Sequence, residues 1–315
     1  QAELGAPPWT LGLSRYSFLD DGSIVCIVSE SGLDHLARLA PGDSALQPIE
    51  GPWTCFYPSS IASRGTTVWT IAGAPGLAQS IVQIDVPHAS HRIVHASFEV
   101  PFDDACIAHP IPLRVPVGGG EQAHALYYPP THPALQGPRG DLPPLIVLSH
   151  GGPTAFALSI LLPHIQFWTS RGIAVVDVNY RGSAGYGRVY RRALCGRWGL
   201  ADVEDCLSAA GRLAGDGLAD PRRLAIRGGS AGGFTTLCAL TFHRLFAAGV
   251  SYYGVGDLEG LAKDTHKFEA HYLDALVGPY PHENETYRRR SPIHAVDRIA
   301  CPVILFQGLD DPIVP

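Results

Sequence analysis

The 315-residue sequence predicts an α/β chain in which an all-β region precedes a doubly wound, mostly parallel sheet. Two observations predict this fold class. Up to residue 105, short apolar runs are separated by turn signals such as Asp20-Asp21-Gly22 and Pro75-Gly76. From residue 141 onward, continuous apolar runs alternate with helical patterns, as they do where strands run parallel. We therefore expect two domains, residues 1–105 and residues 106–315.

Composition excludes several classes of protein. Hydrophobic residues make up 46% of the chain and charged residues 17%, which excludes a disordered or coiled-coil protein. The net charge of −6 argues against binding to nucleic acid, and no apolar run is long enough to cross a membrane. The seven cysteines form no CxxC pair, so we expect no structural zinc and predict free thiols in a reducing, cytoplasmic compartment.

The all-β region predicts part of a β-propeller. The turn before Ile24-Val25-Cys26 recurs about 43 residues later before Thr67-Val68-Trp69, and a period of this size fits blades of four strands. Two blades cannot close a ring, so we interpret the region as the C-terminal blades of a larger propeller. A small β-sandwich is the alternative.

The second region predicts the parallel sheet. After a transition over residues 106–140, whose prolines favour edge or irregular strands, strands and helices alternate. The expected strands span residues 145–149, 173–178, 223–227, 248–252 and 302–307, and the expected helices span 160–170, 201–214 and 234–245. Because ligands of such sheets bind beyond the carboxyl ends of the strands, residues at those ends are the candidates for a site.

One segment between a predicted strand and a predicted helix indicates a nucleophile. It reads Gly228-Gly229-Ser230-Ala231-Gly232-Gly233 and contains the pattern G-x-S-x-G. In that pattern a tight strand-to-helix turn lifts a serine hydroxyl above the sheet, and glycines flank the serine because the turn crowds the backbone. We therefore predict that Ser230 is a catalytic nucleophile on an α/β-hydrolase fold.

Two further segments follow predicted strands. In His150-Gly151-Gly152-Pro153, the N–H of Gly151 is a candidate oxyanion donor, together with the N–H of Ala231. We expect His150 to hold this loop through hydrogen bonds, and a role as general base is the alternative. In the last segment, residues 308–315, Asp310 and Asp311 compete for the role of a carboxylate that orients a histidine.

Residues from about 107 to 315 resemble the catalytic domain of the prolyl oligopeptidase family, nearest its acylaminoacyl-peptidase and dipeptidyl-peptidase branches. The motifs that carry the resemblance are His150–Pro153, Asn179–Gly187, Trp198–Val203, Gly228–Gly233 and Gly308–Pro315. The resemblance implies a serine peptidase that follows a propeller, hydrolyses short peptides through an acyl-enzyme and needs no cofactor. It selects Asp311, three residues before Val314, over Asp310. It also implies that Tyr253 and Val314 line the pocket for the side chain preceding the scissile bond.

The sequence departs from the family pattern in one respect. The chain order in this fold is serine, acid, histidine, and none of the 14 histidines follows Asp311. The chain also lacks Met and begins with Gln1. We therefore expect a fragment truncated at both ends, which lacks the C-terminal segment of its catalytic domain and is nearly inactive by itself.

Several alternatives stay open. The same machinery is compatible with a carboxylesterase or other acyl hydrolase, and the missing histidine is compatible with a non-catalytic binding protein. Arg181 and Tyr186 either approach the site or brace their loop. Asp202, Glu204 and Asp205 are expected to interact with the positive end of a helix dipole. The oligomeric state, including a homo-oligomer, is undetermined.

Overall fold

The computed structural model describes residues 2–6, 11–57, 60–100, 103–265, 267, 269–311 and 313–314. The chain forms two compact units, of which the first contains Gln1–His109, Leu158–Phe167 and Ala184–Arg188, and the second contains Pro110–Ala157, Trp168–Ser183 and Val189–Pro315. Two short segments from the second half of the chain therefore belong to the first unit. In the described part of the chain, no helix is both long and apolar enough to cross a bilayer.

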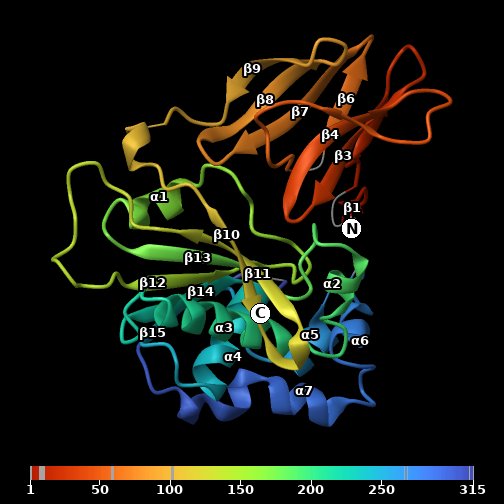
Figure 1. Ribbon diagram of the computed structural model, residues 1–315. Coiled ribbons are helices and arrows are strands. Elements are labelled where there is room, and N and C mark those ends of the chain that lie inside the picture. Colours follow the sequence, from red (N-terminus) through yellow and green to blue (C-terminus); the bar gives the residue numbers. More distant parts are fainter. Residues whose placement is uncertain are drawn as a thin grey trace. The chain divides into compact units, whose positions relative to one another are not determined.

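Two antiparallel sheets form the first unit (Figure 1). The strand order is β1-β3-β4-β5 in one sheet, with β2 also paired to β3, and β6-β7-β8-β9 in the other. The strands are β1 (Ala2–Glu3), β2 (Tyr16–Phe18), β3 (Ile24–Glu30), β4 (Leu33–Leu39), β5 (Gln47–Ile49), β6 (Ile61–Arg64), β7 (Thr67–Ala74), β8 (Leu77–Asp85) and β9 (Ser90–Ala96). From β2 to β5 and from β6 to β9, each strand pairs with the next one in the sequence, as the internal repeat predicts for propeller blades.

The two sheets of the first unit share one hydrophobic core. Alternate residues of the strands point into it, among them Val25 and Ile27 of β3 and Val82 and Ile84 of β8, all fully buried. Because side chains alternate between the two faces of a strand, a run with this period of two buries one face of each sheet.

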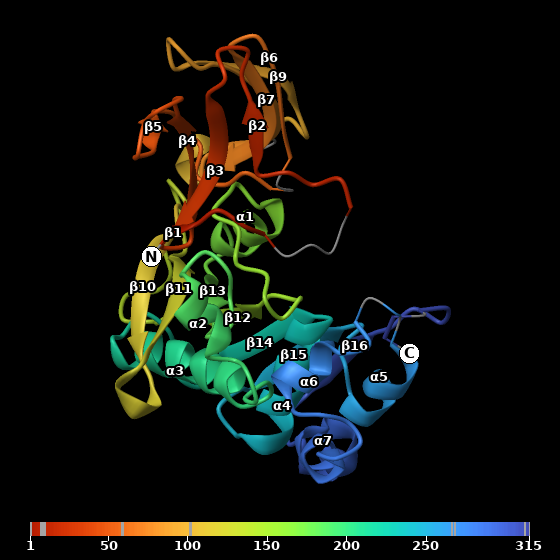
Figure 2. The same ribbon diagram turned by 90° about the vertical axis from the view of Figure 1, so that its right-hand side faces the viewer.

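A seven-stranded sheet forms the centre of the second unit, in the order β10-β11-β13-β12-β14-β15-β16 (Figure 2). Its strands are β10 (Ile111–Pro116), β11 (Gln122–Tyr128), β12 (Leu145–Ser149), β13 (Ala174–Asn179), β14 (Leu224–Gly229), β15 (Ala248–Tyr252) and β16 (Val303–Phe306). The five strands from β13 to β16 are parallel, and β10 and β11 are antiparallel to their neighbours. The prolines of β10 lie on the edge of the sheet, as expected.

Helices cover the second sheet mainly on one face. The helices of the chain are α1 (Pro163–Thr169), α2 (Arg188–Arg192), α3 (Ala201–Gly215), α4 (Ala231–Phe242), α5 (Leu258–Asp264), α6 (Tyr272–Leu276) and α7 (Asn284–Arg290), with 3-10 turns η1 (Asp104–Cys106), η2 (Gly118–Gly120) and η3 (Pro292–Arg298). Helices α3 and α4 lie on the same side of the sheet (Figure 1), where their apolar residues share one core with Val147, Val176 and Ile226.

Several helices differ from the sequence expectation. Helix α1 begins at Pro163 and not at residue 160, because proline lacks the N–H that an interior position needs and fits the first turn. Helix α4 begins at Ala231, three residues before the expected start, because the turn at Ser230 leads directly into it. Helices α5, α6 and α7 lie in a stretch where the sequence analysis assigned no element.

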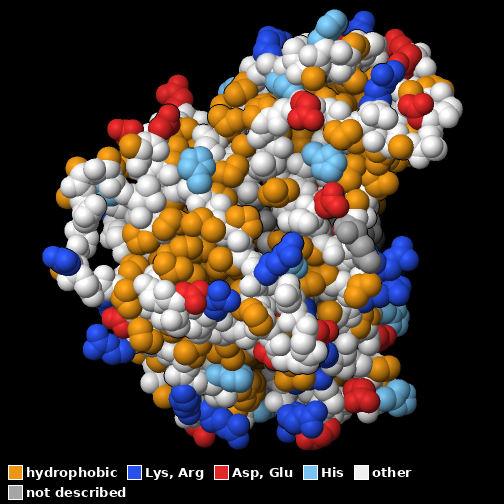
Figure 3. Space-filling model, viewed as in Figure 1, with side chains coloured by type: hydrophobic (Ala, Val, Ile, Leu, Met, Phe, Trp, Pro, Cys, Tyr) orange, Lys and Arg blue, Asp and Glu red, His pale blue; other side chains and the backbone are white. Residues whose placement is uncertain are grey.

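The opposite face of the sheet is only partly buried. On the central strands, Ile146, Ala225 and Val250 are half-buried, whereas a parallel strand is normally covered on both faces. Figure 3 shows hydrophobic side chains gathered over the strands that Figure 1 labels β12 and β13. The edge strand β16 is more open still, since Phe306 is 50% exposed.

One carboxyl group lies within this face. Asp177 in β13 is 7% exposed and is flanked by Leu126 of β11 and Leu148 of β12. Burial raises the pKa of Asp177 to about 7, although the nearby charge of Arg227 lowers it. Between the unfolded pKa of about 4 and this value, the folded state binds more protons than the unfolded chain. The stability contribution of Asp177 is therefore greatest below about pH 4 and is lost as the pH rises to about 7.

We predict that Asp177→Asn stabilises the chain at about pH 8, by up to about 4 kcal/mol, and that this gain disappears near pH 4. The amide cannot ionise, so it avoids the cost of a buried charge. Urea unfolding across this pH range measures the difference in free energy. The exposed Asp264→Asn is the control and should show no such trend. A gain for Asp177→Asn that is independent of pH would contradict the prediction.

Candidate active site

Ser230 occupies a strained turn between β14 and α4. Its φ of 55° and ψ of −123° lie in a region that non-glycine residues rarely adopt. The turn is held on both sides, because the Ser230 N–H donates to the Tyr252 carbonyl at 3.0 Å and the Phe234 N–H donates to the Ser230 carbonyl at 3.0 Å. The strain is thus maintained by β15 on one side and by the first turn of α4 on the other.

The glycines around Ser230 are required by close backbone packing. A Cβ on Gly228 would overlap the carbonyl of Gly232, and a Cβ on Gly232 would overlap the carbonyl of Ser149 at the end of β12. A Cβ on Gly233 would lie 2.5 Å from the Cα of Gly254. The start of α4 therefore lies against the ends of two strands with no room for a side chain.

The Ser230 side chain is half-buried and has no hydrogen-bond partner among the described residues. Gly151 lies beside it, since a Cβ on Gly151 would be 3.6 Å from the Ser230 Cβ. Ala231 is the first residue of α4, so its N–H has no partner within the helix. The structure thus places a hydroxyl that is unpaired among the described residues next to Gly151 and at the N-terminus of a helix.

His150 holds the loop that contains Gly151, and this prediction is confirmed. Its Nδ1 lies 2.9 Å from the Gly151 carbonyl, and its Nε2 lies 2.7 Å from Ser183 Oγ. Burial lowers the pKa of His150 to about 4, so the imidazole is neutral. In the described residues no hydrogen bond joins His150, or any other histidine, to the Ser230 hydroxyl.

Asp311 follows β16 and is ionised. The N–H groups of Ile313 and Val314 donate to its Oδ1 at 2.9 Å and 3.1 Å, and these bonds lower the pKa of Asp311. Among the described residues, Asp311 has no hydrogen bond to a histidine. The two bonds hold this carboxylate in place after β16.

Of the two residues expected to line a specificity pocket, Tyr253 lies near Ser230. Its hydroxyl is 3.1 Å from the position of a Cβ on Gly229, the residue before Ser230, and the side chain is 49% exposed. Val314 is buried, and its carbonyl accepts a hydrogen bond from Gln307 Nε2 at 2.6 Å. Tyr253 thus lies beside the residue before Ser230, and Val314 is hydrogen-bonded to Gln307 and Asp311.

Arg181 braces its loop and does not face the site. It is 1% exposed, its Nη2 donates to Asp205 at 2.7 Å and to Glu204 at 2.6 Å, and its Nη1 contacts Glu121. Asp202 is also buried and accepts bonds from the Gly199 N–H and from Thr235 Oγ1, while burial raises its pKa to about 6. Asp202 and Asp205 are therefore buried and hydrogen-bonded, and Glu204 pairs with Arg181 at the surface, which goes beyond the expected interaction with a helix dipole.

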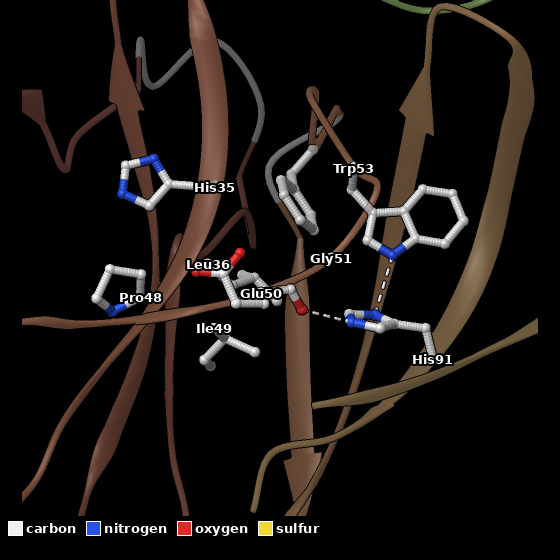
Figure 4. Close-up of a pocket in the computed structure, with 9 residues that line it drawn as sticks. His35, Leu36, Pro48, Ile49, Glu50, Gly51, Trp53 and His91 are labelled. Atoms are coloured by element: carbon white, nitrogen blue, oxygen red, sulfur yellow. Dashed lines mark hydrogen bonds between the residues drawn. The ribbon is translucent and has the colours of Figure 1, made fainter. Parts of the chain in front are cut away.

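A separate cavity lies in the first unit (Figure 4). Its volume is about 280 Å³, and it is lined by His35, Leu36, Pro48, Ile49, Glu50, Gly51, Trp53, Phe56 and His91. Trp53 Nε1 donates to His91 Nδ1 at 3.1 Å, and His91 Nε2 donates to the Glu50 carbonyl at 2.7 Å. His91, in β9, thus joins this strand to the segment between β5 and β6. Within the described ranges, no group of three or more metal-ligating side chains occurs.

The strained serine at the end of a parallel strand, beside a glycine loop and at the start of a helix, defines an α/β-hydrolase fold. Residues 161–315 match the prolyl oligopeptidase family. This part of the chain is similar to that family, as its motifs predicted, and the fold class is confirmed as a partial β-propeller followed by an α/β-hydrolase.

Three comparisons illustrate the relationship. A puromycin-hydrolyzing peptidase of Mycobacterium tuberculosis is 42% identical, with a TM-score of 0.96 over 100% of this chain and 48% of its own. A puromycin hydrolase is 40% identical, with a TM-score of 0.95 over 100% of this chain and 47% of its own. Dipeptidyl peptidase family member 6 of Caenorhabditis elegans is 35% identical over 59% of this chain and 28% of its own length. The chain thus spans less than half of each of these proteins.

We predict that Gly232→Ala destabilises the chain by about 3 kcal/mol, at the upper end of the cost of overpacking, because its Cβ would overlap the Ser149 carbonyl. Gly211→Ala is the matched control. It lies in α3 with nothing within 4 Å of the new Cβ, so it should stabilise by about 0.5–1 kcal/mol. Urea unfolding measures the free energy of unfolding of both variants. Equal changes in this free energy would show that the turn tolerates a side chain.

Proposed function

We propose that this chain carries the nucleophile of a serine peptidase that hydrolyses short peptides, similar to acylaminoacyl-peptidases or dipeptidyl-peptidases. The observation that carries the proposal is the strained Ser230, whose hydroxyl is unpaired among the described residues and lies beside Gly151. Similarity to the prolyl oligopeptidase family supports the choice of peptides as substrates.

In the proposed reaction, the Ser230 oxygen attacks the carbonyl carbon of the substrate, and its proton passes to a histidine oriented by Asp311. The N–H groups of Gly151 and Ala231 stabilise the oxyanion. The tetrahedral intermediate then breaks the C–N bond, the leaving amine takes the proton, and an acyl-enzyme forms on Ser230. Water attacks this ester by the same route and restores the serine. Tyr253 and Val314 would contact the side chain that precedes the scissile bond.

Labelling of Ser230 tests the proposal in the full-length protein. A fluorophosphonate probe should react with the wild type, and Ser230→Ala should abolish both labelling and the hydrolysis of amide substrates. Puromycin is a suitable amide, because two proteins at least 40% identical to this chain are named for its hydrolysis. The control Ser208→Ala, on α3, should behave as the wild type. Failure of the wild type to label would favour a non-catalytic binding protein.

A matched amide and ester pair separates the peptidase from an esterase on the same fold. The two substrates share an acyl group and differ only in the leaving group. A peptidase should hydrolyse both, whereas an enzyme that cleaves only the ester would overturn the assignment of peptides as substrates.

We also propose that the 315-residue chain is nearly inactive by itself, and that the general base follows Asp311 in a longer protein. Removal of the base from a serine triad lowers kcat by about six orders of magnitude. The chain should therefore turn over an amide at a rate close to that of its own Ser230→Ala variant. Turnover of the chain at the rate of the full-length protein would contradict this proposal.

The state of the cysteines indicates the cellular compartment of the protein. All seven are free, and Cys26, Cys55, Cys206 and Cys238 are buried. Free thiols are usual in a reducing compartment, so we propose a cytoplasmic location.

A further inference from the structure

Three consecutive carbonyl groups of the Gly151 loop each accept a hydrogen bond from an aromatic side chain. The Tyr180 hydroxyl donates to the His150 carbonyl at 2.9 Å. His150 Nδ1 lies 2.9 Å from the Gly151 carbonyl, and the Tyr272 hydroxyl donates to the Gly152 carbonyl at 3.0 Å. The carbonyl groups of the loop are therefore held by three side chains. Tyr180 comes from the loop after β13, His150 from the loop itself and Tyr272 from α6.

The first of these bonds acts on the peptide group that carries the oxyanion donor. The His150 carbonyl and the Gly151 N–H belong to one planar trans peptide, so they point in opposite directions. A donor that fixes the carbonyl therefore fixes the direction of the N–H. Because Gly151 lies beside Ser230, that direction decides whether the N–H meets an oxyanion formed there.

The glycines of the loop make such an anchor necessary. Gly151 has no Cβ, and Gly152 has a φ of 109°, so the two residues restrict rotation of the peptide less than other residues would. A Cβ on Gly151 would lie 3.3 Å from the Gly229 carbonyl, a tight contact that glycine avoids. A hydrogen bond thus supplies the orientation that the backbone does not.

Tyr180 is itself rigid. It is fully buried, and its ring stacks on His150 with centroids 4.2 Å apart and an interplanar angle of 17°. The Ser183 N–H donates to the Tyr180 carbonyl at 2.9 Å. A neutral His150 that donates from Nδ1 to Gly151 accepts at Nε2 from Ser183 Oγ, 2.7 Å away. Ser183 Oγ also lies 2.7 Å from the Tyr180 carbonyl, so Tyr180, His150 and Ser183 form one hydrogen-bonded group.

We propose that Tyr180 is a positioning residue for the oxyanion hole, which orients the Gly151 N–H through the His150 carbonyl. The inference rests on the proposed function. It assigns to the tyrosine of the Asn179–Gly187 motif a role in transition-state stabilisation without contact to the substrate. Such a role affects kcat and leaves KM unchanged, because the oxyanion forms only as the carbonyl is attacked.

Tyr180→Phe tests this role in the full-length protein with a peptide amide substrate. The change removes one oxygen and keeps the stacked ring. Loss of an entire oxyanion donor costs about 10²–10³-fold in kcat, so a misaligned donor should cost about 10-fold or more, with KM unchanged. A value of kcat within about twofold of the wild type would overturn the proposal.

Tyr272→Phe is the matched control. It removes the same kind of bond from the same loop, but the Gly152 carbonyl belongs to the peptide with Pro153, which has no N–H to orient. We expect kcat to stay within about twofold of the wild type. An equal loss of kcat in both variants would show that the two tyrosines stabilise the loop as a whole and that Tyr180 does not specifically orient the Gly151 N–H. This result would also overturn the proposal.

A second variant covers the case in which Tyr180→Phe fails to fold. Tyr180→4-aminophenylalanine retains a donor at the same ring position, so it should fold. Its kcat should lie moderately below that of the wild type and above that of Tyr180→Phe, at constant KM. A rise in KM without a change in kcat would contradict the role. A wild type that neither hydrolyses amides nor labels at Ser230 would instead overturn the proposed function, and the inference with it.

Discussion

The candidate site depends on how closely the backbone of α4 approaches the ends of the sheet strands. Gly232 and Gly233 bring the first turn of this helix against β12 and the segment after β15, where no side chain fits. That approach forces the chain to reverse within one residue, which places Ser230 at a positive φ. The cost of such a conformation, of order 1–3 kcal/mol, is offset by the burial of α4 against the sheet. The result is a serine hydroxyl that has no hydrogen-bond partner in the described part of the chain.

A second constraint is that polar groups buried near the site must satisfy one another. Arg181 is fully buried and is neutralised by acids of α3, and the acids in turn fix the start of that helix. His150 is kept neutral by burial and bonded at both nitrogens. Because unpaired polar groups in such surroundings are costly, these networks admit few alternative arrangements. The loops at the carboxyl ends of β12 and β13 are rigid for this reason.

Local patterns predicted a large part of the structure. Strands β12 and β15 were predicted with the observed bounds, because buried parallel strands are short continuous apolar runs. The turn at Ser230 was predicted because glycines flank a serine between a strand and a helix. The helices between β15 and β16 were not predicted, since α5, α6 and α7 are only five to seven residues long and carry little periodic signal. The contribution of residues 158–167 and 184–188 to the first unit depends on long-range contacts and has no local signal.

The sequence by itself determined the class of fold, the turn that holds Ser230 and the glycine loop beside it, because glycine positions and strand ends are constraints within a few residues. Tertiary structure decided what each loop side chain does. The sequence left open whether Arg181 approaches the site, and burial among the acids of α3 resolved it in favour of bracing. The bond from Tyr180 to the His150 carbonyl joins residues 30 apart in the chain. Such a bond depends on the parallel pairing of β12 with β13, which places the loops after these two strands at the same end of the sheet.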